Sequence, residues 1–317
     1  MCCWFTPVSD SAALHHHHGR PPRKLRLPPL LHHPTLAPPR LLPSVTPVVV
    51  VSLHRPAALN GFTDEMADEL VSAFSTLSSD PRVRAVVLAS SDPKNKIFCV
   101  GMDFNQRHDL PPRAEDHRDS GGRVALAVYN CVKPVVAAIN GSAVGIGITM
   151  TLPANIRVAS RDAKVGFVFA RRGFIMEACS SFFLPRLVGA SRALHLVSTG
   201  AVYPASHKLF GELFSEVVAP DEVLPTALAI ADDIAANVST KAARVMKDLI
   251  YRGAESPEEA HLLDSRVFHG MALSEDAKEG KESFLQKRKP EFKATMADAP
   301  SSYPWWTPVD VRVKPKI

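Results

Sequence analysis

The stretch NGSAVGIGITMTLPANIRVAS (residues 140–160), followed after a short link by KVGFVFARRGFIMEACSSFFLPRLVG (residues 164–189), decides how this chain folds. The apolar segment Val135–Ile139 reads as a strand that leads into Gly145 and Gly147 and then into a helix-like apolar run. A glycine turn between a strand and a helix leaves backbone N–H groups open to approach, because no side chain covers them. Such a turn can bind an oxygen atom that becomes negative during a reaction.

The second half of the stretch has one acidic residue, Glu177, in the otherwise uncharged run from Gly173 to Leu184. A carboxyl group in apolar surroundings, with no cation close to it in sequence, should have a raised pKa, as a proton-transferring base requires. A structural carboxylate that caps a following helix is the alternative interpretation. The apolar neighbours expected around it are Phe174, Ile175, Met176, Phe182 and Phe183.

Composition sets wide limits. The chain has 317 residues, enough for one large domain or two small ones, and its net charge is +5. Five basic residues and one acidic residue lie before Ser44, so the remainder is nearly neutral and nucleic acid is not an expected partner. The apolar runs are of strand length, which predicts no membrane span. The odd number of cysteines, without C-x-x-C spacing, favours a reducing compartment.

Changes in residue pattern predict four regions. Residues 1–44 are rich in Pro, His and Arg and should form a disordered N-terminal extension. Residues 45–190 alternate strand-like and helix-like segments, which predicts an α/β fold with short crossovers. Residues 191–293 read as successive helices, and residues 294–317 as a C-terminal tail. Trp305 and Trp306 in that tail could form an interface or pack on the core.

Four motifs, in this order and spacing, resemble the crotonase (enoyl-CoA hydratase/isomerase) superfamily. The resemblance extends from about Thr46 to Lys293. The motifs are LHRPAALN (residues 53–60), FCVGMDF (98–104), VKPVVAAINGSAVGIG (132–147) and EDAKEGKESFLQKRKPEF (275–292).

This resemblance implies a spiral of ββα units, a C-terminal helical trimerisation region and acyl-coenzyme A thioester substrates. It also implies two backbone N–H groups, those of Met102 and Ile146, that hold the thioester oxygen. The substrate-binding residues implied by the two motifs are Gly101, Met102, Asp103, Phe104, Gly145 and Ile146.

The two glutamates that activate water in hydratases of this family fall on Thr149 and Phe169 here, and neither can act as a base. The segment around Glu177 instead resembles the peroxisomal and fungal Δ3,Δ2-enoyl-CoA isomerases, which use one glutamate eight positions further on. We therefore expect isomerisation of 3-enoyl to 2-enoyl thioesters, with Glu177 as the catalytic residue and no metal or redox cofactor. A hydratase or bifunctional enzyme, and a non-catalytic acyl-CoA-binding protein, are the alternatives.

Several further expectations concern supporting features. Asp103 should fix its loop, and Cys99 and Cys179 should be inert buried thiols. Pro315-Lys316-Ile317 resembles a degenerate peroxisomal signal, with mitochondrial or cytosolic localisation as alternatives. A homotrimer or a dimer of trimers is expected, because the C-terminal helices carry more apolar side chains than one thin layer can bury. These are Leu262, Leu263, Val267, Phe268 and Met271.

Overall fold

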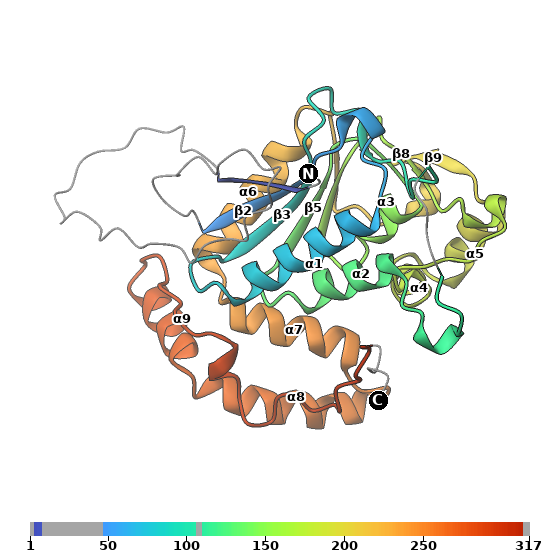
Figure 1. Cartoon of the computed structure of the whole chain (residues 1–317). Helices are drawn as coiled ribbons and strands as arrows, with labels where there is room; N and C mark the ends of the chain where they lie inside the picture. The colour runs from blue at the N-terminus through green and yellow to red at the C-terminus, as the bar shows by residue number, and fades with distance from the viewer. Residues whose placement is uncertain (1–2, 8–46, 106–109, 313–317) are drawn as a thin grey trace, which may run out of the picture.

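Two β-sheets lie at the centre of the part of the chain that the computed structural model describes, residues 3–7, 47–105 and 110–312 (Figure 1). The larger sheet has the strand order β1-β2-β3-β5-β7-β10, and the smaller sheet has the order β4-β6-β8-β9. The strands are β1 (Cys3–Pro7), β2 (Val48–Leu53), β3 (Ala85–Ser90), β4 (Ile97–Cys99), β5 (Val135–Ile139), β6 (Ser142–Val144), β7 (Ile156–Ser160), β8 (Lys164–Gly166), β9 (Val202–Pro204) and β10 (Glu216–Val218).

The chain adds strands to the two sheets in turn. Strands β3, β5 and β7 enter the larger sheet, and each is followed at once by β4, β6 or β8 of the smaller sheet. All these neighbours pair in parallel, with Val87 opposite Val136 and Ala138 opposite Val158 in the larger sheet. Each repeat thus adds one strand to each of the two sheets. This arrangement confirms the predicted α/β spiral.

The helices cover both faces of the larger sheet. In Figure 1, α1 and α2 lie in front of the strands and α6 lies behind them, with α7, α8 and α9 below. Their bounds are α1 (Asp64–Ser79), α2 (Ser120–Asn130), α3 (Ile146–Thr149), α4 (Ser180–Val188), α5 (Ala190–Thr199), α6 (Val223–Asn237), α7 (Thr240–Arg252), α8 (Pro257–Ala272) and α9 (Glu275–Leu285). Short 3-10 turns are η1 (Pro56–Ala58), η2 (Ala114–Asp116), η3 (Phe169–Arg172), η4 (Lys208–Phe210) and η5 (Met296–Asp298).

Local sequence explains how α1 begins and which face it buries. Thr63 caps the helix, and its hydroxyl accepts a hydrogen bond from the Met66 amide at 3.1 Å. Asp64 and Glu65 follow in the first turn, where negative charge is favourable. The buried positions recur at helical spacing and face the sheet. They are Met66, Ala67, Leu70, Ala73, Phe74 and Leu77.

The core has two parts, one on each face of the larger sheet. Alternate side chains of β2 point to opposite faces, so Val51 joins the part under α1 and α2, whereas Val50 joins the part under α6. Both faces are covered, which explains why β2 and β3 read as continuous apolar runs rather than alternating ones. The larger part extends to β6, α3 and α4 through Ala143, Ile146 and Phe183, close in sequence to several candidate site residues.

The structure corrects two expectations about the ends of the fold. Residues 191–293 are not purely helical, because β9 joins the smaller sheet and β10 pairs with β7 in the larger one. Three-residue strands leave too short a pattern to recognise in sequence. In the segment 1–44, Cys3–Pro7 forms β1, antiparallel to β2 at the edge of the larger sheet. An open sheet edge has unpaired backbone groups, with which such a strand can form hydrogen bonds. Residues 8–46 of this segment lie outside the described part.

The C-terminal helices leave apolar side chains exposed in the single chain. Phe268 is 72% exposed and Leu262 71%, whereas Val267 on the same helix is buried.

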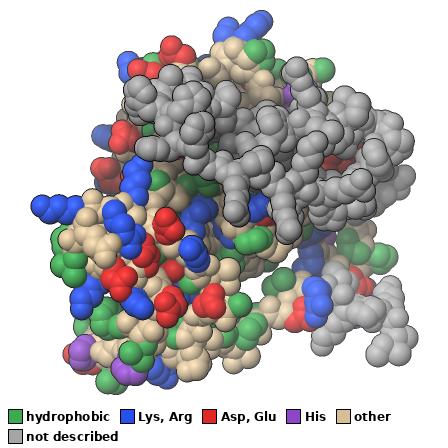
Figure 2. All heavy atoms as spheres, turned by 90° about the vertical axis from the view of Figure 1, so that its left-hand side faces the viewer, with side chains coloured by type: hydrophobic (Ala, Val, Ile, Leu, Met, Phe, Trp, Pro, Cys, Tyr) green, Lys and Arg blue, Asp and Glu red, His purple; other side chains and the backbone are tan. Residues whose placement is uncertain are grey.

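Seen from the α9 side, acidic and basic side chains are intermingled over the described part of the surface (Figure 2). Within the described residues, no helix is long and apolar enough to cross a membrane. The expected trimer stays a prediction.

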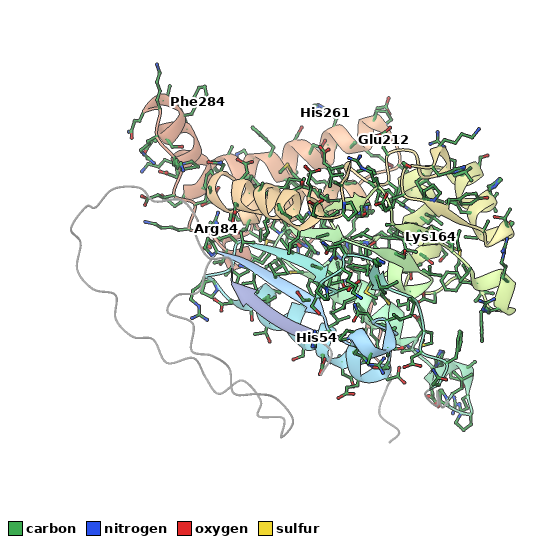
Figure 3. The ribbon with its side chains drawn as sticks, turned by 90° about the horizontal axis from the view of Figure 1, so that it is seen from above. His54, Arg84, Lys164, Glu212, His261 and Phe284 are labelled. Atoms are coloured by element: carbon green, nitrogen blue, oxygen red, sulfur yellow. The ribbon has the colours of Figure 1, made fainter. Side chains whose placement is uncertain are left out.

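Arg84 ties the start of β3 to the C-terminal region. Its guanidinium donates to the carbonyl oxygens of Ala235 and Val238 at the end of α6, at 3.1 and 2.8 Å. It also donates to the carbonyl of Phe292 beyond α9, at 2.8 Å (Figure 3). One half-buried side chain therefore joins the sheet to two segments far along the sequence.

The segment after α9 packs against α7. Asp248, fully buried in α7, pairs with Arg244 at 2.9 Å and accepts a hydrogen bond from the Tyr303 hydroxyl at 2.7 Å. The Trp305 indole donates to the carbonyl of Arg252 at 2.8 Å, and the Arg252 guanidinium lies 4.5 Å from the Trp306 ring centre. The two tryptophans thus pack on their own chain, which decides between the two alternatives for the tail.

Truncation after Ala299 should lower the melting temperature by roughly 5 °C or more, because it removes the Tyr303 hydroxyl that donates to Asp248 and both indoles that pack on α7. Calorimetry checks this, with truncation after Arg312 as the matched control, since it removes only residues outside the described part. Equal melting temperatures for the two truncations would contradict a stabilising tail.

Candidate active site

The first turn of the site follows β4 at Gly101 and Met102. Gly101 has a φ of 104°, a conformation that favours glycine. Phe62 donates its amide to the carbonyl of Gly101 at 2.8 Å and accepts from the amide of Asp103 at 2.9 Å. Both bonds use the neighbours of Met102, so the Met102 N–H points away from Phe62. No residue in the described part of the chain accepts a hydrogen bond from it.

The second turn lies between β6 and α3. Gly145 has φ 57° and ψ −125°, and its amide donates to the carbonyl of Gly166 at 2.9 Å. Ile146 is the first residue of α3, and its amide has no acceptor among the described residues. A Cβ placed on Gly145 would lie 3.9 Å from the Cα of Gly101. The two turns that carry the predicted oxyanion amides are therefore in contact.

Glu177 joins the second turn through Thr149. The Thr149 hydroxyl donates to Oε1 of Glu177 at 2.6 Å and also lies 3.2 Å from the carbonyl oxygen of Gly145. Its single proton can serve either acceptor, so the hydroxyl can donate to the ionised carboxylate or turn to Gly145 when the carboxyl is protonated. Thr149, the position to which the family resemblance assigns one glutamate of a hydratase, thus donates to the glutamate at position 177.

The environment of Glu177 raises its pKa from 4.5 to about 7. Burial is the main cause, because it disfavours the charged form, and the negative charge of Asp119 adds to it. The hydrogen bond from Thr149 acts in the opposite direction. A carboxyl group that titrates near neutral pH can both remove and return a proton under physiological conditions.

Two of the apolar residues that precede Glu177 in sequence are exposed rather than buried around it. Phe174 and Ile175 are 60% and 87% exposed, so that expectation is wrong for these two neighbours. Phe183 is buried, but its ring packs against Tyr129, 5.6 Å between ring centres.

Gly121, near the start of α2, lies directly against the Glu177 carboxylate. A Cβ at this position would come within 1.9 Å of Oε2 of Glu177 and 2.7 Å of Cδ1 of Ile146. Only a residue without a side chain leaves the carboxylate and the Ile146 turn in their observed places. The sequence carries only a weak signal for this, a Gly-Gly pair just before the predicted helix, which the structure places in the first turn of α2.

The remaining expected substrate-binding residues lie at the first turn. Asp103 pairs with Arg55 at 3.1 Å, and its other oxygen accepts from the amide of Asn105 at 3.1 Å. These hydrogen bonds hold the pKa of Asp103 below its usual range. Phe104 stacks on Phe174 with 6.2 Å between ring centres, so this turn contacts the segment that leads to Glu177.

Phe169 and two thiols complete the surroundings. A Cβ on Gly145 would be 3.9 Å from the Phe169 ring, so an apolar side chain lies beside the Gly145 turn. Burial raises the pKa of Cys99 to about 12 and also raises that of Cys179, so neither thiol is an activated nucleophile. Within residues 47–105 and 110–312, no cluster of three or more His, Cys, Asp or Glu side chains is arranged to hold a metal.

The sequence resembles known proteins over most of its length. The family model described as "Enoyl-CoA hydratase/isomerase" matches residues 45–295. "Enoyl-CoA hydratase AFT3-1" of Alternaria alternata is 45% identical over 81% of this chain and 86% of the relative. "Enoyl-CoA hydratase ACTT3" of the same fungus is 45% identical over 80% of this chain and 86% of the relative.

Solved structures give the same result. A probable enoyl-CoA hydratase/isomerase from Mycobacterium abscessus has a TM-score of 0.71 and 32% identity, over 80% of this chain and 97% of that one. An enoyl-CoA hydratase from Bacillus anthracis has a TM-score of 0.70 and 29% identity, over 79% of this chain and 96% of that one. With this fold and these relatives, the chain belongs to the enoyl-CoA hydratase/isomerase family and is an enzyme of that family.

Proposed function

We propose that this enzyme isomerises 3-enoyl-coenzyme A thioesters to 2-enoyl thioesters, with Glu177 as its single base. The observation that carries the proposal is the hydrogen bond between Thr149 and Glu177. A hydratase of this family holds water between two glutamates, but here Thr149 and Phe169 occupy those positions. The carboxylate beside the Ile146 turn comes instead from Glu177, whose pKa of about 7 suits proton transfer.

The proposed reaction moves one proton along the acyl chain. Glu177 takes a proton from C2 of the 3-enoyl thioester, and the electron pair passes through the carbonyl carbon to the thioester oxygen. The amides of Met102 and Ile146 donate hydrogen bonds to that oxygen; loss of one such donor typically costs about 3 kcal/mol of barrier. The protonated Glu177 returns the proton to C4, and the double bond then lies between C2 and C3. No residue other than Glu177 needs to change its protonation state.

Hydration of 2-enoyl thioesters is the second candidate. The observation that favours it is the similarity to the two Alternaria relatives, both of which are described as enoyl-CoA hydratases. In that reaction Glu177 alone would remove a proton from water as the oxygen attacks C3, and would then deliver that proton to C2. The Phe169 ring close to Gly145 leaves an apolar surface where the second water-binding carboxylate would be, which favours isomerisation.

Replacing Glu177 by Gln should lower isomerisation of 3-enoyl thioesters at least about 100-fold, since an amide of the same shape cannot accept the proton. Acyl-CoA binding should persist. Turnover of 3-enoyl and 2-enoyl thioesters of several chain lengths measures both candidate reactions. The matched control is Glu212→Gln, an exposed glutamate (labelled in Figure 3). Near-full isomerisation by the Gln variant would refute the role of Glu177, and faster hydration than isomerisation in the wild type would favour the second candidate.

The rate of isomerisation should rise with pH and level off above about 7, because only the ionised Glu177 can take the proton from C2. The Thr149 hydroxyl lowers the pKa of Glu177, so Thr149→Val should move this rise to higher pH. Rate measurements from pH 5 to 9 check both statements. A profile that is flat across this range, or one that moves to lower pH in the Val variant, would contradict the assignment.

Gly121→Ala should reduce turnover about tenfold or more, because the new methyl group displaces the Glu177 carboxylate from its observed place. Gly280→Ala is the matched control, since a Cβ there makes only ordinary contact with Phe292, at 3.6 Å. Steady-state rates and melting temperatures of both variants are compared. Wild-type turnover in Gly121→Ala would show that the carboxylate is not confined at this point.

A further inference from the structure

Asp119 is bound to two separate backbone segments by one carboxylate oxygen. As the N-cap of α2, its Oδ1 accepts a hydrogen bond from the amide of Gly122. The same oxygen accepts from the amide of Ala178, the residue directly after Glu177, at 3.2 Å. Helix capping alone requires only the first of these bonds, so the bond to Ala178 needs a separate explanation.

The backbone after Glu177 adopts a conformation that side chains disfavour. Ala178 and Cys179 have φ values of 53° and 55°, in the left-handed region, and neither is glycine. Two consecutive residues of this kind persist only where their surroundings hold them in place. The hydroxyl and the amide of Ser180 both donate to the carbonyl of Glu177, the amide at 2.9 Å. Asp119 holds the other side of the turn through the Ala178 amide.

The segment that carries Asp119 is itself fixed. Arg118 donates from Nε to the carbonyl of Val311 in the C-terminal tail at 2.8 Å, and from Nη1 to the carbonyl of Glu115 at 2.8 Å. Gly121, two residues after Asp119, lies against the Glu177 carboxylate. The start of α2 therefore contacts Glu177 at its side chain and, through Asp119, at the adjacent backbone.

We propose that Asp119 is a positioning residue for Glu177: its carboxylate holds the strained turn at Ala178 so that the Glu177 side chain lies beside the Ile146 turn. It does not need to contact the substrate. This inference rests on the proposed function, in which Glu177 is the base. It assigns a second role to a residue whose local sequence indicates only a helix cap.

Electrostatics gives the proposal a measurable consequence. The negative charge of Asp119 contributes to the raised pKa of Glu177. The other titratable groups close enough to interact with Glu177 are the thiols of Cys99 and Cys179, whose pKa values are themselves raised by burial, so both are neutral near pH 7. No cation contributes to the pKa of Glu177 among the described residues. Removal of the charge at position 119 should therefore lower the pKa of Glu177.

The experiment uses the full chain with Asp119→Asn and Asp119→Ala. Asn keeps an oxygen that can accept from the Gly122 and Ala178 amides but removes the charge, whereas Ala removes both. Asp116→Asn is the matched control, since Asp116 lies in the same segment and its ion-pair partner is Arg113, at 3.9 Å. Titration of carboxyl ¹³C signals assigns the pKa of Glu177, with the signal that Glu177→Gln removes as the reference. Rates and KM for 3-enoyl thioesters are measured in parallel.

The expected results differ between the two variants. In Asp119→Asn, Glu177 titrates at lower pH than in the wild type, with turnover near the wild-type value above neutral pH. In Asp119→Ala, kcat falls about tenfold while KM changes little, because the base is displaced and the acyl-CoA contacts are not. Loss of a helix cap alone would lower the melting temperature without moving the titration of Glu177.

Two opposite results are distinguishable. An unchanged Glu177 titration in Asp119→Asn, together with wild-type kcat in Asp119→Ala, overturns the positioning role while Glu177→Gln remains inactive. Wild-type turnover in Glu177→Gln overturns the proposed base, and the inference with it.

Discussion

The hydrogen bond from Thr149 to Glu177 is the contact on which the site depends, because it joins a carboxylate from one turn of the spiral to the glycine turn of another. Burial raises the free energy of an ionised carboxylate, and one well-placed donor offsets part of that cost. Thr149 also lies 3.2 Å from the carbonyl of Gly145, one residue before the Ile146 amide. The proposed base and the proposed oxyanion donor are thus linked by a single hydroxyl group.

Parallel pairing of strands in the spiral places these groups close together. Strands β4 and β6 pair in parallel, so the turns that follow them, at Gly101 and Gly145, end at the same edge of the smaller sheet. Both glycines have positive φ values, which turn the chain sharply and leave the next amide exposed. Gly121 of helix α2 lies against Ile146 and the Glu177 carboxylate. A site on strand ends and helix starts moves less than one on free loops, which favours precise proton transfer.

Local patterns in the sequence predicted the parts of the site that depend on near neighbours. Glycine turns after apolar strands indicated an oxyanion site, and the lone charge in an apolar run indicated Glu177. The family resemblance assigned the oxyanion amides to Met102 and Ile146. Asp119 and Gly121 were missed because they lie more than 50 residues before Glu177, and contacts over that distance leave no periodic signal. Closeness in sequence also misled the prediction: Phe174 and Ile175 were expected to bury Glu177 but are exposed, since neighbours in sequence need not be neighbours in space.

This chain differs from a two-glutamate hydratase in the polar groups available to hold a water molecule as well as in the number of catalytic bases. Hydration needs a place where water is held by polar groups, because a water molecule without two or more partners is not retained in an apolar cavity. Thr149 already donates its proton to Glu177, and the Phe169 side chain offers no polar atom. Allylic proton transfer needs the opposite, since water near the charged intermediate would compete for the proton and weaken the oxyanion hydrogen bonds. Thr149 and Phe169 therefore fit the proposed isomerisation better than hydration by two glutamates.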